Sequence, residues 1–249
     1  MVNIIVIIFA LLIGSFLNVV IYRIPRKESV LWPGSHCPAC EQGLKIGDLM
    51  PVISYVWLGG RCRYCRDRIS PRYLLVEILT VITFLLVFLK WGISVETGTG
   101  WIFTAILTIT AFTDLDEGII PDLITCPGIV IGLLLSPYMI GIKSSALGAI
   151  IFSGICISIA ILSHGGMGGG DIKLAGFIGT FTGYGGSMIT LIIASVAGGI
   201  WAAILLWQGK AHRKTAIKFG PFLSVAAWLV WMYEIEILIS IFGYSLYTY

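Results

Sequence analysis

The sequence predicts an all-α polytopic membrane protein with about eight transmembrane helices and one small polar loop domain. Of its 249 residues, 57% are apolar and only 12% are charged, which is about half the charged fraction of an ordinary soluble domain. The mean hydropathy is +0.96. These values exclude a soluble globular enzyme and a disordered chain. No basic face is spread along the chain, so the sequence does not indicate a nucleic-acid partner.

Eight apolar runs are candidates for membrane spans, each of which needs about 20 apolar residues. The first run is too long for a removable signal peptide, and no basic residue precedes it. The third and sixth runs are short, and the sixth and seventh could merge through Tyr184–Gly186. The eight runs are 3–22, 73–91, 100–114, 122–142, 145–163, 172–184, 188–207 and 220–243.

The polar residues divide the chain into three expected parts: a first transmembrane helix over 1–22, a loop domain over 23–72 and a transmembrane core over 73–249. The loop domain carries nine Lys and Arg residues, and a second basic loop, 208–219, carries Lys210, Arg213, Lys214 and Lys218. Short basic loops stay in the cytoplasm. Both loops are cytoplasmic if the N-terminus is outside and the spans alternate. The same alternation puts the joining segments 114–122 and 164–171 on the cytoplasmic side.

Four cysteines in the loop domain predict a metal site. They form two Cys-x-x-Cys pairs, Cys37 with Cys40 and Cys62 with Cys65. Two such pairs at this separation are typical of a tetrahedral Zn²⁺ site, and four sulfur ligands leave no open position for catalysis. A loop of this size has too little core to fold unaided, so we expect a structural Zn²⁺. Reduced or redox-active thiols are the alternative. Cys126 and Cys156 lie in predicted spans and are expected to be buried and inert.

Two acidic clusters lie at the predicted cytoplasmic face. Asp114 closes the third span, and Asp122 follows Pro121 at the start of the fourth. Asp171 ends a glycine-rich run, Gly165–Gly170, whose backbone can bend and approach another segment closely. Ionisable residues at membrane depth usually mark functional sites. The pattern fits an aspartic protease pair, an ion or proton pathway lined by Asp, or simple helix caps.

The combination of motifs resembles the type IV prepilin leader peptidases, membrane aspartic proteases of the Gly-x-Gly-Asp class. Four stretches carry the resemblance: Gly14–Pro25, the cysteine pairs with Ile69–Tyr73 and Glu77, Asp114–Asp122, and Gly166–Leu174. The resemblance covers residues 14–174, and the last 75 residues match only in being apolar.

This resemblance implies a membrane endopeptidase that removes the leader of prepilins or pseudopilins at the cytoplasmic face of the bacterial inner membrane. It also implies N-methylation of the new terminus with S-adenosylmethionine, for which the sequence shows no recognisable binding motif. A peptidase without methyl transfer and an Asp-lined transporter or channel are the alternatives. Prepilin and membrane lipid are the expected partners, and the sequence does not specify an oligomeric state.

The resemblance assigns catalysis to two aspartates. Asp171 matches the Gly-x-Gly-Asp motif, and Asp114 best fits the first aspartate. Asp116 is the alternative, but it lies about 200° round a helix from Asp114 and cannot face the same partner if the helix continues. Asp122 is expected to be a helix-start residue. Asn18 is read as an interhelical hydrogen-bonding group or part of a methyl-transfer site, and Glu77 as facing the active region or pairing with Arg72 or Arg68.

Overall fold

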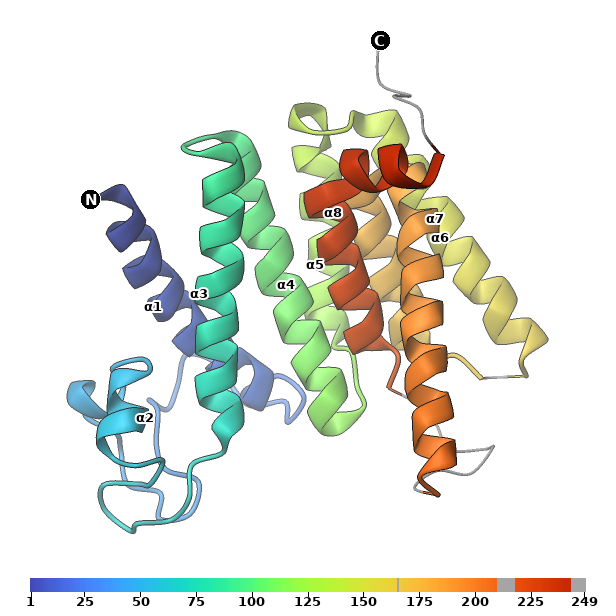
Figure 1. Cartoon of the computed structure of the whole chain (residues 1–249). Coiled ribbons are helices and arrows are strands. Elements are labelled where there is room, and N and C mark those ends of the chain that lie inside the picture. Colours follow the sequence, from blue (N-terminus) through green and yellow to red (C-terminus); the bar gives the residue numbers. More distant parts are fainter. Residues whose placement is uncertain (165, 210–217, 243–249) are drawn as a thin grey trace. The chain divides into compact units, whose positions relative to one another are not determined.

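Helices dominate the computed structural model, which describes residues 1–164, 166–209 and 218–242, with side chains up to 233 (Figure 1). The long helices are α1 (Val2–Arg23), α3 (Pro71–Trp91), α4 (Val95–Glu117), α5 (Asp122–Leu135), α6 (Ile142–Leu162), α7 (Gly169–Trp207) and α8 (Gly220–Phe242). The short elements are η1 (Ile46–Asp48), α2 (Ile53–Trp57) and η2 (Ser136–Tyr138).

The described helices confirm an all-α membrane protein. Within the described residues, five helices are long and apolar enough to cross a membrane, namely α1, α3, α4, α6 and α7. The shorter apolar stretches Asp122–Tyr138 and Gly220–Tyr233 correspond to the fourth and eighth predicted spans. Three residues of the second basic loop, Lys210, Arg213 and Lys214, lie outside the described residues, so the orientation stays a prediction.

The sixth and seventh predicted spans form one helix, α7, with a kink at Gly183. The backbone of Gly183 adopts φ 66° and ψ −173°, and the helix resumes at once on the far side. A Cβ at this position would lie 2.6 Å from Oγ of Ser144, so glycine satisfies both the conformation and the close approach of α6. The polar and glycine-rich sequence here marks a bend within one helix.

Two other predicted boundaries are wrong by several residues. Helix α4 starts at Val95, before the predicted residue 100. The helix can include the polar residues there because the threonine hydroxyls donate hydrogen bonds to backbone carbonyls. Thr97 Oγ1 donates to the carbonyl of Gly92 at 2.7 Å, and Thr99 Oγ1 to that of Val95 at 2.6 Å. The fourth span stops as an α-helix at Leu135, where Pro137 enters the 3₁₀ turn η2.

The chain divides into two compact units, Met1–Ile109 and Thr110–Tyr249, with the boundary inside α4. In the first unit, α1 packs against α3. Gly14 allows this approach, since its Cβ would lie 3.0 Å from the Cα of Glu77. Nδ2 of Asn18 donates to the carbonyl of Tyr73 at 2.9 Å, as the interhelical interpretation predicts. Phe9, Phe84 and Trp101 form an aromatic cluster in the same unit.

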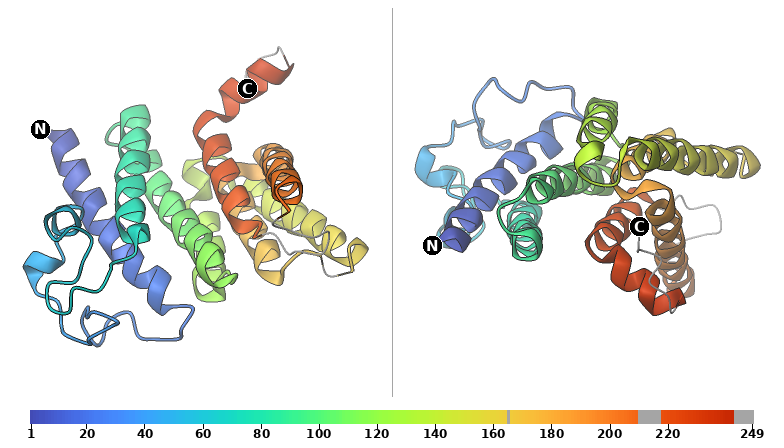
Figure 2. Two further views of the ribbon diagram at one scale, coloured as in Figure 1. Left: turned by 60° about the horizontal axis from the view of Figure 1, so that its bottom comes forward. Right: turned by 90° about the horizontal axis from the view of Figure 1, so that it is seen from above.

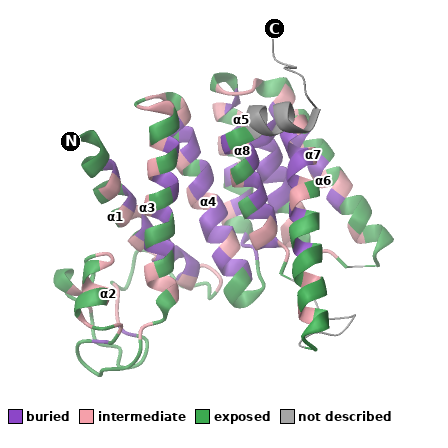
Figure 3. Ribbon diagram, viewed as in Figure 1, coloured by how far each residue is buried: buried purple, intermediate pink, exposed green. Residues whose placement is uncertain are grey.

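In the second unit, α7 lies at the centre and packs against α5, α6 and α8. The approach of α6 is close because Gly148 faces Gly179, and a Cβ on either would overlap the other's backbone. The Ser145 hydroxyl reinforces the contact by donating to the carbonyl of Thr180 at 2.7 Å. Figure 2 shows the helices of this unit from two further directions, and Figure 3 shows the buried residues concentrated on their facing sides. Small residues permit such backbone contact between membrane helices.

Candidate functional site

The four loop cysteines come together in the first unit. Their Sγ atoms all lie within 4.8 Å of one another, and all four are free thiols. The Sγ atoms of Cys37 and Cys65 are 3.8 Å apart. A tetrahedral Zn²⁺ with bonds of about 2.3 Å would separate its sulfurs by about 3.8 Å. The donor set and its spacing therefore fit Zn²⁺, and this cluster could hold one.

Two tight turns, residues 37–42 and 62–67, present these sulfurs with the same backbone hydrogen bonds, and each is called a knuckle here. The N–H of Cys37 donates to the carbonyl of Gln42 at 3.0 Å, and the N–H of Cys62 donates to that of Asp67 at 2.8 Å. In each knuckle the residue four positions after the first cysteine has positive φ, 56° at Glu41 and 62° at Arg66. Backbone N–H groups of Cys65 and Tyr64 point at the Cys62 sulfur and lower the pKa of that thiol to about 7. A thiol of low pKa is a ready metal ligand.

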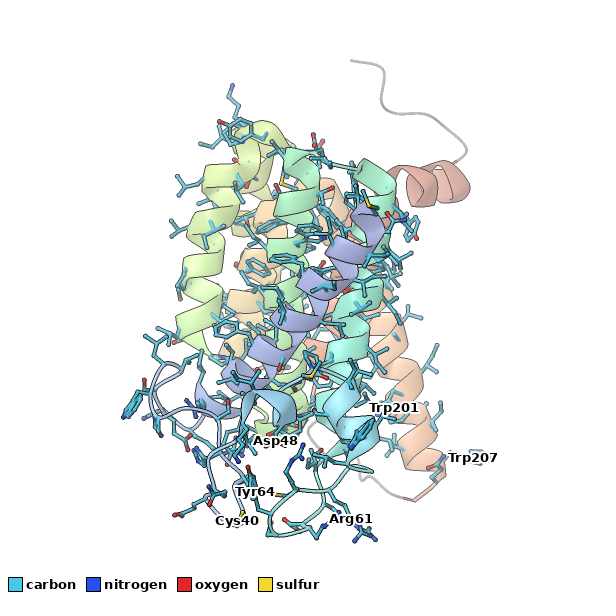
Figure 4. The ribbon with its side chains drawn as sticks, turned by 90° about the vertical axis from the view of Figure 1, so that its left-hand side faces the viewer. Cys40, Asp48, Arg61, Tyr64, Trp201 and Trp207 are labelled. Carbon is cyan, nitrogen blue, oxygen red and sulfur yellow. The ribbon has the colours of Figure 1, made fainter. Side chains whose placement is uncertain are left out.

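A buried carboxylate ties the second knuckle to the preceding segment. The side chain of Asp48, at the end of η1, is only 3% exposed and accepts a hydrogen bond from Nε of Arg63. It also accepts from the backbone N–H of Lys45 at 3.1 Å and from the hydroxyl of Tyr64 at 3.4 Å. Figure 4 shows Asp48 and Tyr64 beside one another, with Cys40 and Arg61 in the same loop. Asp48 thus fixes the second knuckle through neutral and charged donors.

Asp114 lies in the last turn of α4, in the second unit, and is 7% exposed. Its Oδ2 accepts a hydrogen bond from the backbone N–H of Gly220, the first residue of α8, at 3.0 Å. Lys218 reaches the same helix end, because its Nζ donates to the carbonyl of Leu115 at 2.6 Å. The positive end of the α8 dipole and an ammonium group therefore both face this carboxylate region.

Asp171 lies in the first turn of α7, where its backbone N–H donates to the carbonyl of Gly168 at 3.1 Å. Its Oδ1 is buried and has no hydrogen-bond partner among the described residues. Glycines surround it: a Cβ at Gly168 would lie 3.2 Å from its Oδ2, and one at Gly170 would lie 2.9 Å from Cβ of Ile120. Buried carboxylate oxygens without a partner are rare in folded proteins, and they occur where the group has a catalytic role.

The two aspartates lie near one another in the second unit. They are close enough for their carboxylates to interact electrostatically. The side chain of Ile120 lies close both to Gly170, which precedes Asp171, and to Gly220, which is bonded to Asp114. An added Cβ atom at either glycine would contact it. The Asp114 carboxylate accepts a hydrogen bond from Gly220, and the Asp171 carboxylate has an unpartnered oxygen. Such an asymmetric pair can activate water by general acid–base chemistry.

The other acidic residues of the two clusters point elsewhere. Helix α4 continues to Glu117, so Asp116 lies on a different face from Asp114 and is exposed. Asp122 is the first residue of α5, as predicted, and its Oδ2 pairs with Nζ of Lys173 at 2.6 Å. Among the remaining cysteines, Cys156 is buried as expected, whereas Cys126 is exposed because it lies on an outer face of α5.

Glu77 contacts the loop domain of its own unit. It is 8% exposed, and its Oε2 accepts a hydrogen bond from the backbone N–H of Val52 at 2.7 Å. Neither reading of Glu77 from the sequence included this backbone contact. Asn18 is 2% exposed, and its Oδ1 has no partner among the described residues.

Sequence reasoning missed three contributors to the aspartate site: Lys218, Gly220 and Ile120. Gly220 acts through its backbone N–H and through its lack of a side chain, since a Cβ would lie 2.8 Å from Oδ2 of Asp114. The available signal was the segment Lys218-Phe-Gly-Pro at the start of the last apolar run. The apolar run from residue 220 predicted a membrane span there, but the sequence did not indicate that its first residue contacts Asp114.

Two family models match the chain. The bacterial peptidase A24 N-terminal domain matches residues 8–91, and the type IV leader peptidase family matches residues 101–203. The first match includes the four cysteines, and the second includes Asp114 and Asp171. No solved structure matches the chain significantly.

Several curated relatives are similar over nearly their whole length. A prepilin leader peptidase/N-methyltransferase of Dichelobacter nodosus is 34% identical, over 95% of this chain and 93% of the relative. A relative with the same description in Neisseria gonorrhoeae is 33% identical over 90% of this chain and 87% of the relative. Another, in Bacillus subtilis, is 31% identical over 91% of this chain and 92% of the relative.

Proposed function

Because the chain belongs to the type IV leader peptidase family, we propose that it is a membrane aspartic endopeptidase that cleaves the leader of prepilins or pseudopilins. The observation that carries the proposal is the pair of carboxylates, Asp114 and Asp171, at the meeting of α4, α7 and the start of α8. The relatives are described as prepilin peptidases, so neither a transporter nor a channel is favoured.

In the proposed reaction the two aspartates share one proton, because like charges so close together do not both ionise easily. We assign Asp114 as the ionised member, because it accepts the hydrogen bond from the Gly220 N–H and because Lys218 contacts the same helix end. It takes a proton from water, which attacks the scissile carbonyl. Asp171 carries the shared proton on its unpartnered Oδ1, donates to the developing oxyanion and later helps protonate the departing amine.

The proposed role of the cysteine cluster is structural. Four sulfur ligands close the coordination shell, so a Zn²⁺ held by Cys37, Cys40, Cys62 and Cys65 would supply folding energy to the loop and no open coordination position. The two knuckles and the Asp48 contacts would then be fixed by the metal. The cysteines would hold the metal as thiolates, which is the form of cysteine that binds metal ions.

We further propose that the protein N-methylates the new terminus with S-adenosylmethionine as methyl donor, because the relatives are described as bifunctional. The proposed setting is the bacterial inner membrane, with the N-terminus outside and the cysteine loop in the cytoplasm. The basic loop 23–72 supports this orientation through the positive-inside rule. Cleavage would then take place at the cytoplasmic face.

The test is to incubate the purified full-length protein with a prepilin and follow release of the leader. Wild type should cleave, and Asp171→Asn should lower the rate at least about 100-fold, as loss of an acid–base group does. Full cleavage by the Asn variant would refute the proposed chemistry. In a second step, labelled S-adenosylmethionine should label the new N-terminus. A cleaved product without label would show that the protein is a peptidase without methyltransferase activity.

A further inference from the structure

The cysteine loop carries an apolar face that the chain leaves uncovered. Helix α2, Ile53–Trp57, is a single turn with two different sides. Ile53, Val56 and Trp57 share one side and are 55%, 68% and 84% exposed. On the opposite side, the hydroxyl of Tyr55 donates to the carbonyl of Ile69 at 3.4 Å and so holds the turn to the rest of the loop. The exposed side is therefore fixed in direction.

A hydrogen bond places this turn beside a membrane helix. The N–H of Val52, the residue before α2, donates to Oε2 of Glu77 at 2.7 Å. Glu77 lies six residues beyond Pro71, the first residue of α3, which is about 9 Å along the helix axis. Figure 1 likewise shows α2 at the level of the lower turns of α3. The exposed face of α2 is thus level with the first turns of a membrane-spanning helix.

Helix α3 also exposes apolar side chains at the same depth. Leu75 and Ile78, which flank Glu77 along the helix, are 54% and 41% exposed. In a membrane-spanning helix such exposed side chains face lipid, so the bilayer reaches the depth at which α2 is held. Tryptophan beside a short apolar turn is typical of the membrane interface.

The charge of the loop fits the same surroundings. Residues 23–72 hold nine Lys and Arg against four acidic residues, Glu28, Glu41, Asp48 and Asp67. Basic segments next to a membrane helix are attracted to anionic headgroups. An apolar turn with basic flanks lies stably in the boundary between headgroups and acyl chains.

We propose that α2 is an interfacial anchor, with Ile53, Val56 and Trp57 inserted into the phospholipid interface and Glu77 holding the turn at that depth. Glu77 is then a positioning residue that joins the cysteine loop to α3. The loop lies against the bilayer rather than free in the surrounding water. This inference is independent of the proposed peptidase activity.

The test uses the full-length protein in nanodiscs of phosphatidylcholine and phosphatidylglycerol, with and without bromine on the upper acyl carbons. The Trp57 emission is obtained by subtracting the spectrum of Trp57→Phe from that of wild type. It should be blue-shifted, and brominated lipid should remove most of it. A red-shifted emission that brominated lipid leaves unchanged would overturn the proposal. So would a blue-shifted emission that changes with protein concentration but not with bromine, since a second copy would then cover Trp57.

A matched pair of variants tests the role of Glu77. Glu77→Leu removes the acceptor for the Val52 N–H, so the Trp57 emission should shift to the red and the exchange of the Val52 amide hydrogen should become faster. Glu77→Gln keeps a carbonyl acceptor and should retain the wild-type emission and exchange. Identical emission and exchange in all three proteins would refute a positioning role. The metal content of each variant reports whether the loop has folded.

Discussion

The cysteine loop and the aspartate site are built in opposite ways. The four cysteines lie within one short segment, and two knuckles with the same hydrogen bonds present their sulfurs. The aspartate site draws on three helices, and the hydrogen bond from Gly220 to Asp114 joins residues 106 positions apart. The loop depends on local turns and an expected metal, whereas the aspartates depend on the packing of long apolar helices. The two regions should therefore respond differently to substitution.

The largest expected effect is the loss of metal from the loop. Replacing the buried Cys37 with Ser removes one sulfur ligand, and affinity for Zn²⁺ should fall at least about 100-fold, since even changes outside the ligand shell cost 10–100-fold. Metal analysis of the purified full-length protein measures this. Cys126→Ser is the matched control, because Cys126 lies on α5 outside the cluster and should leave the metal content unchanged. Equal metal in both variants would contradict the four-sulfur site.

The next effect should come from Gly220, where only a backbone N–H acts on Asp114. A Cβ in Gly220→Ala would lie 2.8 Å from Oδ2 of Asp114 and push the carboxylate aside. Prepilin cleavage should fall about 10–100-fold, as expected when a reacting group is displaced by about 1 Å. Gly154→Ala is the control, because its Cβ would meet nothing within 4 Å. Similar rates in the two variants would show that Gly220 does not position Asp114.

Lys218 should have a smaller effect, because it contacts the end of α4 rather than the carboxylate itself. Its Nζ donates to the carbonyl of Leu115 at 2.6 Å. Lys218→Met should slow prepilin cleavage about threefold, in line with ~0.3–1 kcal/mol for a cation at a helix C-terminus. Lys218→Arg keeps the charge and should cleave at nearly the wild-type rate. A loss of activity as large as that of Gly220→Ala would mean that Lys218 contacts the reacting groups directly.

The smallest effect concerns the backbone of the knuckles. Arg66 has φ 62°, a conformation that favours glycine. Relief of this strain should outweigh the greater entropy of glycine in the unfolded chain, so Arg66→Gly should stabilise the loop by about 0.5 kcal/mol. Thermal unfolding of the metal-loaded protein measures the change. Arg61→Gly lacks this strain and should be neutral or destabilising, and a gain in that variant instead would refute the explanation.

The sequence was sufficient for the cysteine cluster and for the ends of the helices that carry the aspartates. Cysteine spacing reports a local structure directly, and a carboxylate at the end of an apolar run marks the membrane boundary. Asp116 could be set aside because a continuing helix turns it away from Asp114, and α4 does continue to Glu117. These inferences needed only the geometry of one segment at a time.

Contacts between distant segments could not be predicted in the same way. Gly220 contributes a backbone N–H and an absent side chain, neither of which has a pattern in sequence. Glu77 accepts a hydrogen bond from the backbone N–H of Val52. Reasoning from charge suggested an arginine side chain as its partner and could not indicate a backbone group. At Gly183 the sequence indicated an interruption, but only the packing of α6 decides whether the helix bends or ends.

The most direct test of the central claim compares Asp114→Asn with Asp116→Asn in prepilin cleavage by the full-length protein. The two positions lie in the same helix turn, but only Asp114 is buried and bonded to Gly220. The account predicts that Asp114→Asn lowers cleavage at least about 100-fold. Asp116→Asn should stay within about threefold of wild type, because the carboxylate of Asp116 takes no part in the proton transfers of the reaction. Full activity in Asp114→Asn, together with loss of activity in Asp116→Asn, would contradict the assignment of the catalytic pair.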